Sequence, residues 1–378
     1  MLKHVKRTLS GMLCLAMFMG VLSSCGGGNN NQSNSNPNTN SGASHSNNSS
    51  TSSLSGEYDL TQVNDRIYTL GHTGSPGSTN DFWAETFAGL VKEKSGGKMV
   101  IENYNSSQLG SDTSIAADVQ AGAVDFQITS PAAIPTVVPE SAIFDMPFLF
   151  DKVEDAREVL LNEDFFSTIS DAFAKYDLKL FPFTDQGFRS ITTNVEITGI
   201  DSFKGMALRT MNNQHHIAWF TALGVAATPL NTSEIYLALQ QGMLNGQENP
   251  WSQCYDKGLY DVQKYITNSN HVLYVGCLYT GTKTWDTLSE VEQQILWDAA
   301  TECVPIVQEH TDSYEYEMLD LLLEDYNMTF TDFDKIPGLR DTLREKTFDV
   351  AYQSISSAIG TEILNQFLIT AGYEDQIP

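Results

Sequence analysis

The fold is decided by residues 67–104, which read IYTLGHTGSPGSTNDFWAETFAGLVKEKSGGKMVIENY. Ile67–His72 predicts a first strand, and Met99–Tyr104 predicts a second. Between them, Asp81–Lys94 carries aromatic and aliphatic residues at helical spacing, and a Gly pair follows where a helix usually ends. A strand, a helix and a strand in this order predict a βαβ unit and a parallel sheet.

The alternation of helical and strand patterns continues downstream. The spacing predicts a helix over Ser111–Ala121 with Gly122 as its stop, and then a short buried strand over Val124–Thr129. Lys152–Phe173 has a helical pattern, and Leu178–Phe183 has the pattern of another strand. The chain is therefore predicted to be α/β over this whole region.

Two further helices are predicted from their first residues. Asn231 and Glu234 stand three residues apart, which is the spacing of a capping box. The segment Thr287-Leu288-Ser289-Glu290 has the same spacing and opens a helical run that extends to Tyr326. Because Pro305 lies inside this run, it is either one long helix that links two lobes or two ordinary helices that break at the proline.

The N-terminus carries the pattern of an export signal. Three basic residues among the first seven precede an apolar stretch, Leu9–Leu22, that is too short to span a bilayer comfortably. The tetrapeptide Leu22-Ser23-Ser24-Cys25 resembles a bacterial lipobox. We expect residues 1–24 to be a lipoprotein signal peptide and Cys25 to carry the lipid; the alternative is a plain signal peptide with an incidental cysteine.

Residues 25–57 are predicted to form a disordered linker between the lipid anchor and the folded part. From residue 26 to residue 56 the chain is rich in Gly, Asn, Ser and Thr and contains no Asp, Glu, Lys or Arg. Such a composition cannot bury a core. We therefore expect an extracytoplasmic protein that is held at the outer face of the cell membrane or in the periplasm, with no later apolar run long enough to cross a bilayer.

The bulk composition excludes some classes of function. The 378 residues carry 21 Lys and Arg against 47 Asp and Glu, and removing residues 1–24, with three basic and no acidic residues, changes the net charge from −26 to −29. Such an acidic chain is not expected to bind nucleic acid. About 320 residues remain after the linker, which suits two lobes. Three cysteines remain, which predicts small buried side chains, with one disulfide as the alternative: Cys254, Cys277 and Cys303.

Two arginines are the strongest candidates for binding chemistry. The sequence contains no nucleophile elbow, zinc-protease motif, P-loop or dinucleotide fingerprint, so we expect no metal and no cofactor. Arg189 and Arg209 both stand in locally apolar sequence, and a guanidinium there is paired or reaches solvent. Each can hold a ligand carboxylate with two parallel hydrogen bonds, or bridge a structural acid. The polar segment Asn245–Trp251 is either a ligand-contacting loop or a solvated turn.

Six segments, in this order, resemble the DctP-type substrate-binding proteins of tripartite ATP-independent periplasmic (TRAP) transporters. The similarity covers nearly all of residues 66–350, and the segments that carry it are EKSGGK (93–98), YNSSQLG (104–110), GAVDF (122–126), GFRS (187–190), FKGMALR (203–209) and IYLALQQGMLNGQENP (235–250).

The resemblance implies an α/β, two-lobe, periplasmic-binding-protein-like (Venus flytrap) fold with a hinge and a long helix that spans both lobes. Within a binding domain over residues 58–378, it implies one lobe over about 66–186 and 274–320 and a second over about 187–273 and 321–378. The lobes close on a ligand in the cleft between them. The ligand contacts that it implies are Arg209 as the principal carboxylate-binding residue, Arg189 as the second, Asn249 and Thr232, and, from the first lobe, His72 or Thr73, Asp112 and Ser130.

The resemblance also implies a solute receptor, not an enzyme, that delivers a small organic acid to the membrane subunits of a permease. Thr232 stands where acid-sugar binders of the family often have Phe, Ser130 stands where an acidic residue can occur, and Thr210-Met211-Asn212-Asn213 lacks the frequent Val-Pro. A dicarboxylate, a 2-oxo acid and a sugar acid therefore all remain open, and Gln247 with Glu248 are candidates to hold a cation in a 2-oxo-acid binder. The alternatives are a ligand-sensing protein for a signalling partner, an envelope enzyme and a receptor of an ATP-driven system.

Overall fold

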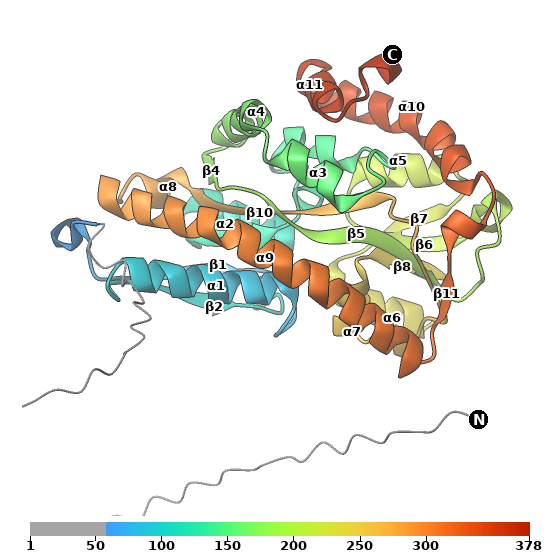
Figure 1. Ribbon diagram of the computed structural model, residues 1–378, viewed down its shortest axis with the longest axis horizontal. Helices are drawn as coiled ribbons and strands as arrows, with labels where there is room; N and C mark the ends of the chain where they lie inside the picture. Colours follow the sequence, from blue (N-terminus) through green and yellow to red (C-terminus); the bar gives the residue numbers. More distant parts are fainter. Residues whose placement is uncertain (1–57) are drawn as a thin grey trace, which may run out of the picture. The chain divides into compact units, whose positions relative to one another are not determined.

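The computed structural model describes residues 58–378, which form a mixed α/β structure within one compact unit (Figure 1). The predicted signal peptide, Cys25 and the predicted linker lie outside the described residues. The lobe boundaries expected from the sequence stay a prediction.

Eleven strands within residues 58–378 belong to one sheet, whose main path has the order β2-β1-β3-β10-β5-β8-β6-β7. The strands are β1 (Arg66–Gly71), β2 (Met99–Tyr104), β3 (Phe126–Thr129), β4 (Leu178–Leu180), β5 (Thr184–Thr193), β6 (Ala207–Thr210), β7 (Ala226–Pro229), β8 (Gly246–Asn249), β9 (Tyr265–Thr267), β10 (Val272–Gly281) and β11 (Thr329–Thr331). β5 and β10 are the two long strands, at ten residues each. β10 pairs with β3 and β4 along one half and with β5 along the other, so these two strands join the halves of the sheet.

Helices cover the sheet (Figure 1). They are α1 (Thr79–Lys94), α2 (Asp112–Ala121), α3 (Val153–Leu160), α4 (Glu163–Ala174), α5 (Gln214–Ala222), α6 (Ile235–Gln240), α7 (Trp251–Asp256), α8 (Thr282–Trp285), α9 (Glu290–Glu324), α10 (Leu339–Ile359) and α11 (Glu362–Thr370), with short 3-10 turns between them. α9 packs against α1 near its beginning and against β5 and α7 further along.

The predicted βαβ unit is confirmed. β1 pairs with β2 in parallel through all six residues of each strand, and α1 connects them. Gly122 stops α2 as predicted, and it does so in the left-handed conformation, at φ 75°. The expectation of a parallel sheet is wrong in part, because β10 runs antiparallel to β3 and β5, and β5 runs antiparallel to β8. These antiparallel pairs join the two parallel parts of the sheet.

The predicted helix over residues 152–173 is two helices, α3 and α4. They are separated at Leu161 and Asn162, where the Asn162 side chain accepts a hydrogen bond from the backbone N–H of Phe165, at 2.9 Å. An Asn favours this capping conformation over the interior of a helix. Periodicity alone does not reveal the break, because both helices bury apolar residues.

The long helical run is one helix of 35 residues that continues through Pro305. Its capping box differs from the prediction: the first cap is Ser289, whose hydroxyl accepts from the N–H of Glu292, while Glu292 accepts from the N–H of Ser289. A helix of this length extends over about 52 Å. Pro305 is exposed, and the flanking turns are packed against α1 and α7, so packing outweighs the local cost of the proline.

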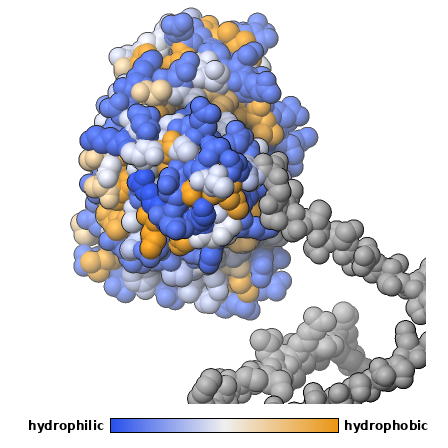
Figure 2. All heavy atoms as spheres, turned by 90° about the vertical axis from the view of Figure 1, so that its left-hand side faces the viewer, coloured by the Kyte–Doolittle hydropathy of each residue, from blue (hydrophilic) through white to orange (hydrophobic). Residues whose placement is uncertain are grey.

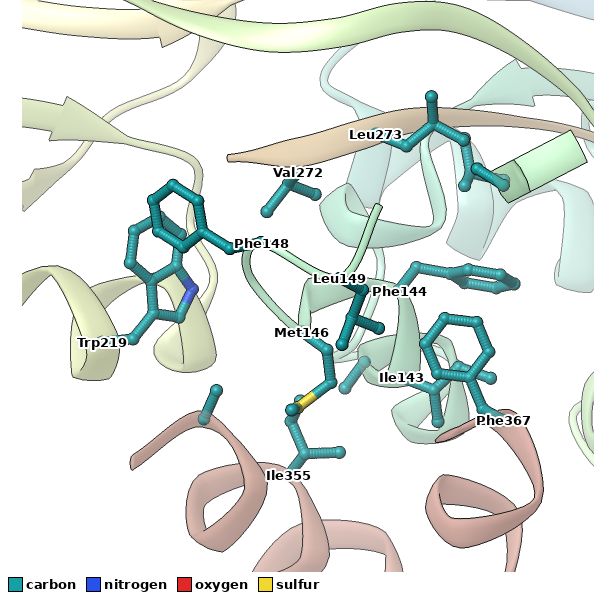
Figure 3. Close-up of a cluster of buried hydrophobic side chains, with 14 of the residues drawn as sticks. Ile143, Phe144, Met146, Phe148, Leu149, Trp219, Val272, Leu273, Ile355 and Phe367 are labelled. Carbon is teal, nitrogen blue, oxygen red and sulfur yellow. The ribbon is translucent and has the colours of Figure 1, made fainter. Parts of the chain in front are cut away.

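Apolar side chains fill the space between the sheet and the C-terminal helices (Figure 3). Val272 and Leu273 of β10 contribute from the sheet side, and Ile355 of α10 and Phe367 of α11 contribute from below. Phe144 meets Phe367 edge to face, with ring centroids 5.8 Å apart. The end of the chain is therefore part of the hydrophobic core that supports β10.

The cysteine expectation is confirmed for the three described cysteines, which are buried free thiols at Cys254, Cys277 and Cys303. Burial raises the pKa of Cys254 and Cys303 to about 12, which makes their thiolates scarce. The disulfide alternative is wrong. The outer surface is mainly hydrophilic on the side drawn in Figure 2, with hydrophobic residues in small separate groups, as expected for a strongly acidic chain.

Candidate functional site

A polar cavity of about 980 Å³, open to solvent, lies where the ends of several strands and helices meet. The first half of the chain contributes Thr73, which follows β1, and Asp112 at the start of α2. The second half contributes Arg189 of β5, Arg209 of β6 and further polar groups. The lining residues are Thr73, Ser107, Gly110, Ser111, Asp112, Thr113, Ala133, Arg189, Arg209, Met211, Asn212, Leu230, Asn231, Thr232, Ser233, Asn249, Gln253 and Tyr274.

Arg189 is almost completely buried and is fixed by Glu248 and Asn249. β5 and β8 are antiparallel neighbours with Ser190 opposite Asn249, and this register brings the side chains of Arg189, Glu248 and Asn249 together. Arg189 Nε donates to Glu248 Oε2, while Nη2 donates to Glu248 Oε1 at 3.0 Å and to Asn249 Oδ1 at 3.0 Å. The remaining nitrogen, Nη1, is buried without a hydrogen-bond partner among the described residues. This guanidinium therefore has a structural role and one unused donor.

Arg209 has a different environment. Its Nε and Nη2 both donate to the carbonyl oxygen of Leu230, at 3.0 and 2.7 Å. No carboxylate forms an ion pair with it among residues 58–378. A neutral carbonyl orients this guanidinium without balancing its charge. The structural alternative considered for both arginines, an ion pair with an internal acid, therefore describes Arg189 and not Arg209.

The pKa shifts agree with this difference. Burial lowers the pKa of Arg209 to about 10, which leaves it positively charged at neutral pH. Burial acts on Arg189 in the same sense, but the charge of Glu248 outweighs it and the pKa of Arg189 is raised. Burial raises the pKa of Glu248, but Arg189 and a hydrogen bond from His271 outweigh it and hold that pKa well below its usual range. The pair is ionised, and its charges cancel.

Asp112 provides a carboxyl group in the same cavity. Its Oδ1 accepts a hydrogen bond from the Thr129 hydroxyl at 2.7 Å, and the Thr73 hydroxyl lies 3.2 and 3.3 Å from its two oxygens. Burial raises the pKa of Asp112, and the two threonine hydroxyls oppose this shift. Because a carboxylate oxygen accepts more than one hydrogen bond, Asp112 Oδ2 has capacity for a further donor in the cavity.

Six of the eight ligand contacts expected from the sequence line this cavity; His72 and Ser130 do not. The His72 ring is fully buried, and its Nδ1 accepts from the N–H of Gly74 at 3.1 Å. Its Nε2 lies 3.6 Å from Asp81 Oδ1. Ser130 is buried as well. The preference for Thr73 over His72 follows from strand alternation, because Tyr68, Leu70 and His72 are buried on one side.

Sequence reasoning missed Gln253 and Tyr274. Tyr274 lies 5.2 Å from the Arg189 guanidinium, measured to its ring centroid. It belongs to β10, whose ten residues are all buried, so no alternation marks it as a cavity residue. Gln253 follows the Asn245–Trp251 segment and donates to Gln186 Oε1 at 2.8 Å. The sequence did offer one indication for Gln253: it lies on the first turn of α7, just after the polar Asn245–Trp251 segment.

The cation site considered at Gln247 and Glu248 does not fit the contacts. Glu248 is fully buried and accepts from Arg189 and from His271, at 3.2 Å. Gln247 Nε2 donates to Thr192 at 2.9 Å, and its Oε1 accepts from Asn249 at 2.5 Å. Among residues 58–378 no group of three or more His, Cys, Asp or Glu side chains is arranged to hold a metal ion. The Glu248 oxygens already accept hydrogen bonds from Arg189 and His271, and Gln247 Oε1 already accepts one from Asn249.

The chain matches a known family of binding proteins. The family model DctP, described as bacterial extracellular solute-binding protein, family 7, matches residues 70–338, which is more than half of the chain. The chain belongs to this family. An uncharacterised protein of Haemophilus influenzae is 32% identical over 62% of this chain and 71% of its own length. Two other relatives, from Verminephrobacter eiseniae and Sinorhizobium fredii, are matched over 64% and 38% of their own lengths.

Solved structures of DctP relatives have the same fold. The sugar-acid-binding protein DctPAm of Advenella mimigardefordensis, solved with galactonate, has a TM-score of 0.78 and 29% identity, over 82% of this chain and 99% of that one. A TRAP periplasmic solute-binding protein of Desulfovibrio salexigens, solved with orotic acid, has a TM-score of 0.77 and 26% identity, over 81% and 98%.

These similarities establish that the chain has the two-lobe fold of TRAP periplasmic binding proteins. They also establish that it belongs to a family of solute receptors and not of enzymes. The expectation made from six short segments is therefore confirmed at the level of family and fold. No helix among the described residues is both long and apolar enough to cross a membrane.

Proposed function

We propose that this DctP-family receptor binds a small organic acid with a single carboxylate in the polar cavity and delivers it to the membrane permease of a TRAP transporter. The observation that carries the proposal is the pair of guanidinium groups in the cavity wall. Among residues 58–378, Arg189 Nη1 is a buried donor without a hydrogen-bond partner, and Arg209 is a buried cation that forms no ion pair with a carboxylate. Its nearest acceptor is the Leu230 carbonyl, and the charges of Glu248 and Asp112 act on it from further away. A carboxylate supplies the missing acceptor and the missing negative charge.

Charge balance favours one carboxylate over two. Glu248 forms its ion pair with Arg189, so Arg209 is the cation of the cavity wall that forms no ion pair among residues 58–378. On the other side of the cavity Asp112 offers a carboxyl group that forms no ion pair among the described residues, and the charge of Lys257 favours its ionised form. A second carboxylate of a ligand that reached Asp112 would bury two like charges together. Hydroxyl groups would instead donate to Asp112 and exchange hydrogen bonds with the hydroxyls of Thr73 and Thr232.

This arrangement supports a hydroxylated monocarboxylate, such as a sugar acid, over a dicarboxylate. The ligands of the two solved relatives, galactonate and orotic acid, also have one carboxyl group each. Closure of the cavity would remove water from the carboxylate and the arginines and so strengthen their attraction. The closed form is then the form that a permease would recognise.

A thermal-shift screen with calorimetric titration tests the ligand class. The panel contains galactonate, glucuronate and orotate, with succinate as the dicarboxylate and galactitol as the neutral polyol. We expect at least one monocarboxylate to raise the melting temperature and to bind with 1:1 stoichiometry, and galactitol to have no effect. Tight binding of galactitol, or preference for succinate over every monocarboxylate, would contradict the proposal.

We further propose that residues 1–24 are cleaved as a signal peptide, that Cys25 is lipidated, and that residues 25–57 tether the receptor to the outer face of the membrane. The order of basic residues, apolar stretch and cysteine supports this. The Cys25→Ala variant, expressed in a bacterial host with lipoprotein processing, should move from the membrane fraction to the soluble fraction. A wild-type chain that is soluble without detergent would contradict it.

A further inference from the structure

We infer that Glu315 of α9 is a positioning residue: it ties the beginning of α7, and with it the cavity residues Asn249 and Gln253, to the long helix, so that ligand affinity depends on a carboxylate that the ligand does not touch. This inference rests on the proposed function. Glu315 does not line the ligand cavity. It lines a separate hollow of about 730 Å³, together with Gly187 and Trp251.

The contacts of Glu315 are specific and buried. Its side chain belongs to a residue that is only 6% exposed. Oε2 accepts from the backbone N–H of Trp251 at 2.9 Å, and Oε1 accepts from the N–H of Ser252 at 3.1 Å. These are the first residues of α7, whose N–H groups have no partners within the helix. One carboxylate therefore satisfies two backbone donors that lie between Asn249 and Gln253 in the chain.

Neighbouring residues of α9 show that this contact is one part of a larger attachment. One turn earlier, the Thr311 hydroxyl donates to the carbonyl of Asp185 in β5 at 3.0 Å. The Tyr314 hydroxyl donates to Asp256 Oδ1 at 2.7 Å, at the other end of α7. α9 thus holds both ends of α7 and also the strand that carries Arg189. A displacement of α9 relative to α7 would move Asn249, which orients Arg189 Nη2.

Gly187 makes the close approach possible. It lies in β5 with φ of +71°, and a Cβ at this position would lie 3.1 Å from Glu315 Cγ. Both its backbone conformation and its lack of a side chain are therefore needed where β5 passes the carboxylate. The position of Glu315 therefore depends on a glycine of strand β5 as well as on the backbone N–H groups of α7.

The protonation state of Glu315 provides a test that separates positioning from general stability. Burial raises the pKa of Glu315 to about 8, and the N–H groups of Ser252 and Trp251 oppose the shift. Above this pKa both oxygens accept; below it one oxygen carries a proton that competes with a backbone donor, so the tie weakens. The charged groups around it are Asp256 on α7, Asp312 on α9, the Arg157–Asp185 pair, and Asp151, Lys152 and Glu154 beside the hollow.

The experiment compares Glu315→Gln with Glu317→Gln, an exposed glutamate on the same helix. Galactonate is titrated calorimetrically at pH 6.5 and 9.5. We expect wild type and Glu317→Gln to bind about fivefold more tightly at the higher pH, as one hydrogen bond of ordinary strength implies, and Glu315→Gln to change by less than twofold. Parallel pH profiles in all three proteins would overturn the inference.

Hydrogen exchange of the unliganded proteins at pH 8, over residues 250–257, separates this inference from the choice of ligand. Faster exchange in Glu315→Gln than in Glu317→Gln is expected, and equal exchange would overturn the tie. If galactonate does not bind wild type at either pH, that result contradicts the proposed ligand class, and the exchange measurement alone decides whether Glu315 holds α7.

Discussion

Replacement of Arg209 by methionine isolates the charge that the cavity does not balance. Methionine has a similar length and can occupy the buried site of Arg209, which is 2% exposed. The substitution removes the cation and leaves the Leu230 carbonyl without two donors, a loss of about 1 kcal/mol. It also removes the cost of keeping an uncompensated cation buried. We therefore expect the melting temperature of the unliganded protein to stay within a few degrees of wild type.

Ligand binding should respond very differently. Leaving a buried carboxylate without its cationic partner costs about 3–5 kcal/mol, which corresponds to roughly a 10²- to 10³·⁵-fold rise in Kd. The assay is calorimetric titration of the acid identified by the thermal-shift panel. The matched control is Arg66→Met, which removes the same charge from a partly exposed arginine that pairs with Asp125 at 3.4 Å outside the cavity. A folded Arg209→Met protein that binds within threefold of wild type would refute the assignment of the carboxylate to Arg209.

Three further predictions use the other charged groups. Arg189→Met should lower the free energy of unfolding by about 3–5 kcal/mol in chemical denaturation, because it leaves the Glu248 charge buried without its partner; a loss below 1 kcal/mol would contradict the structural role. Asp112→Asn should raise the affinity for succinate relative to galactonate by at least about tenfold, measured by calorimetry, and an unchanged ratio would count against the charge-balance argument. Because the pKa of Glu315 is raised to about 8 from 4.5, the native state holds this proton more tightly than the unfolded state, so wild-type stability should fall between about pH 5 and pH 8 more steeply than that of Glu315→Gln.

The sequence predicts the parts of this molecule that depend on neighbouring residues. The βαβ unit over residues 67–104 and the stop at Gly122 follow from local periodicity and from the conformational freedom of glycine. The break at Asn162 escapes the same reasoning, since two adjacent amphipathic helices share one period. The antiparallel β10 also escapes it, because strand direction is set by connections that are distant in the sequence.

The division of roles between the two arginines could not be predicted for the same reason. Both stand in apolar sequence and both line the cavity. What separates them is the antiparallel register of β5 and β8, which places Glu248 and Asn249 beside Arg189. Arg209 lies in β6, which meets β8 only at Leu208 and Gly246 and pairs with β7 on its other side, where Thr228 stands opposite Arg209. The positions of these residues in the sequence give no information about this pairing. The family resemblance predicted that both arginines contact the ligand, but it did not predict the partners of either side chain.

The unequal charge balance of the two arginines links closure of the cavity to the presence of an anion. In the open cavity, water can still reach the wall that contains Arg209, so its uncompensated charge is tolerated. Closing the two sides over an empty cavity would strip that water from Arg209, and the charges of Glu248 and Asp112 would offset only part of the cost, since burial already outweighs them in lowering the pKa of Arg209. A neutral polyol can form the same hydroxyl contacts with Asp112 but cannot offset this cost. Arg189 adds little to the penalty because Glu248 already balances it. We therefore expect selectivity for an acid to arise less from attraction in the open form than from the free-energy cost of closing the cavity without an anion.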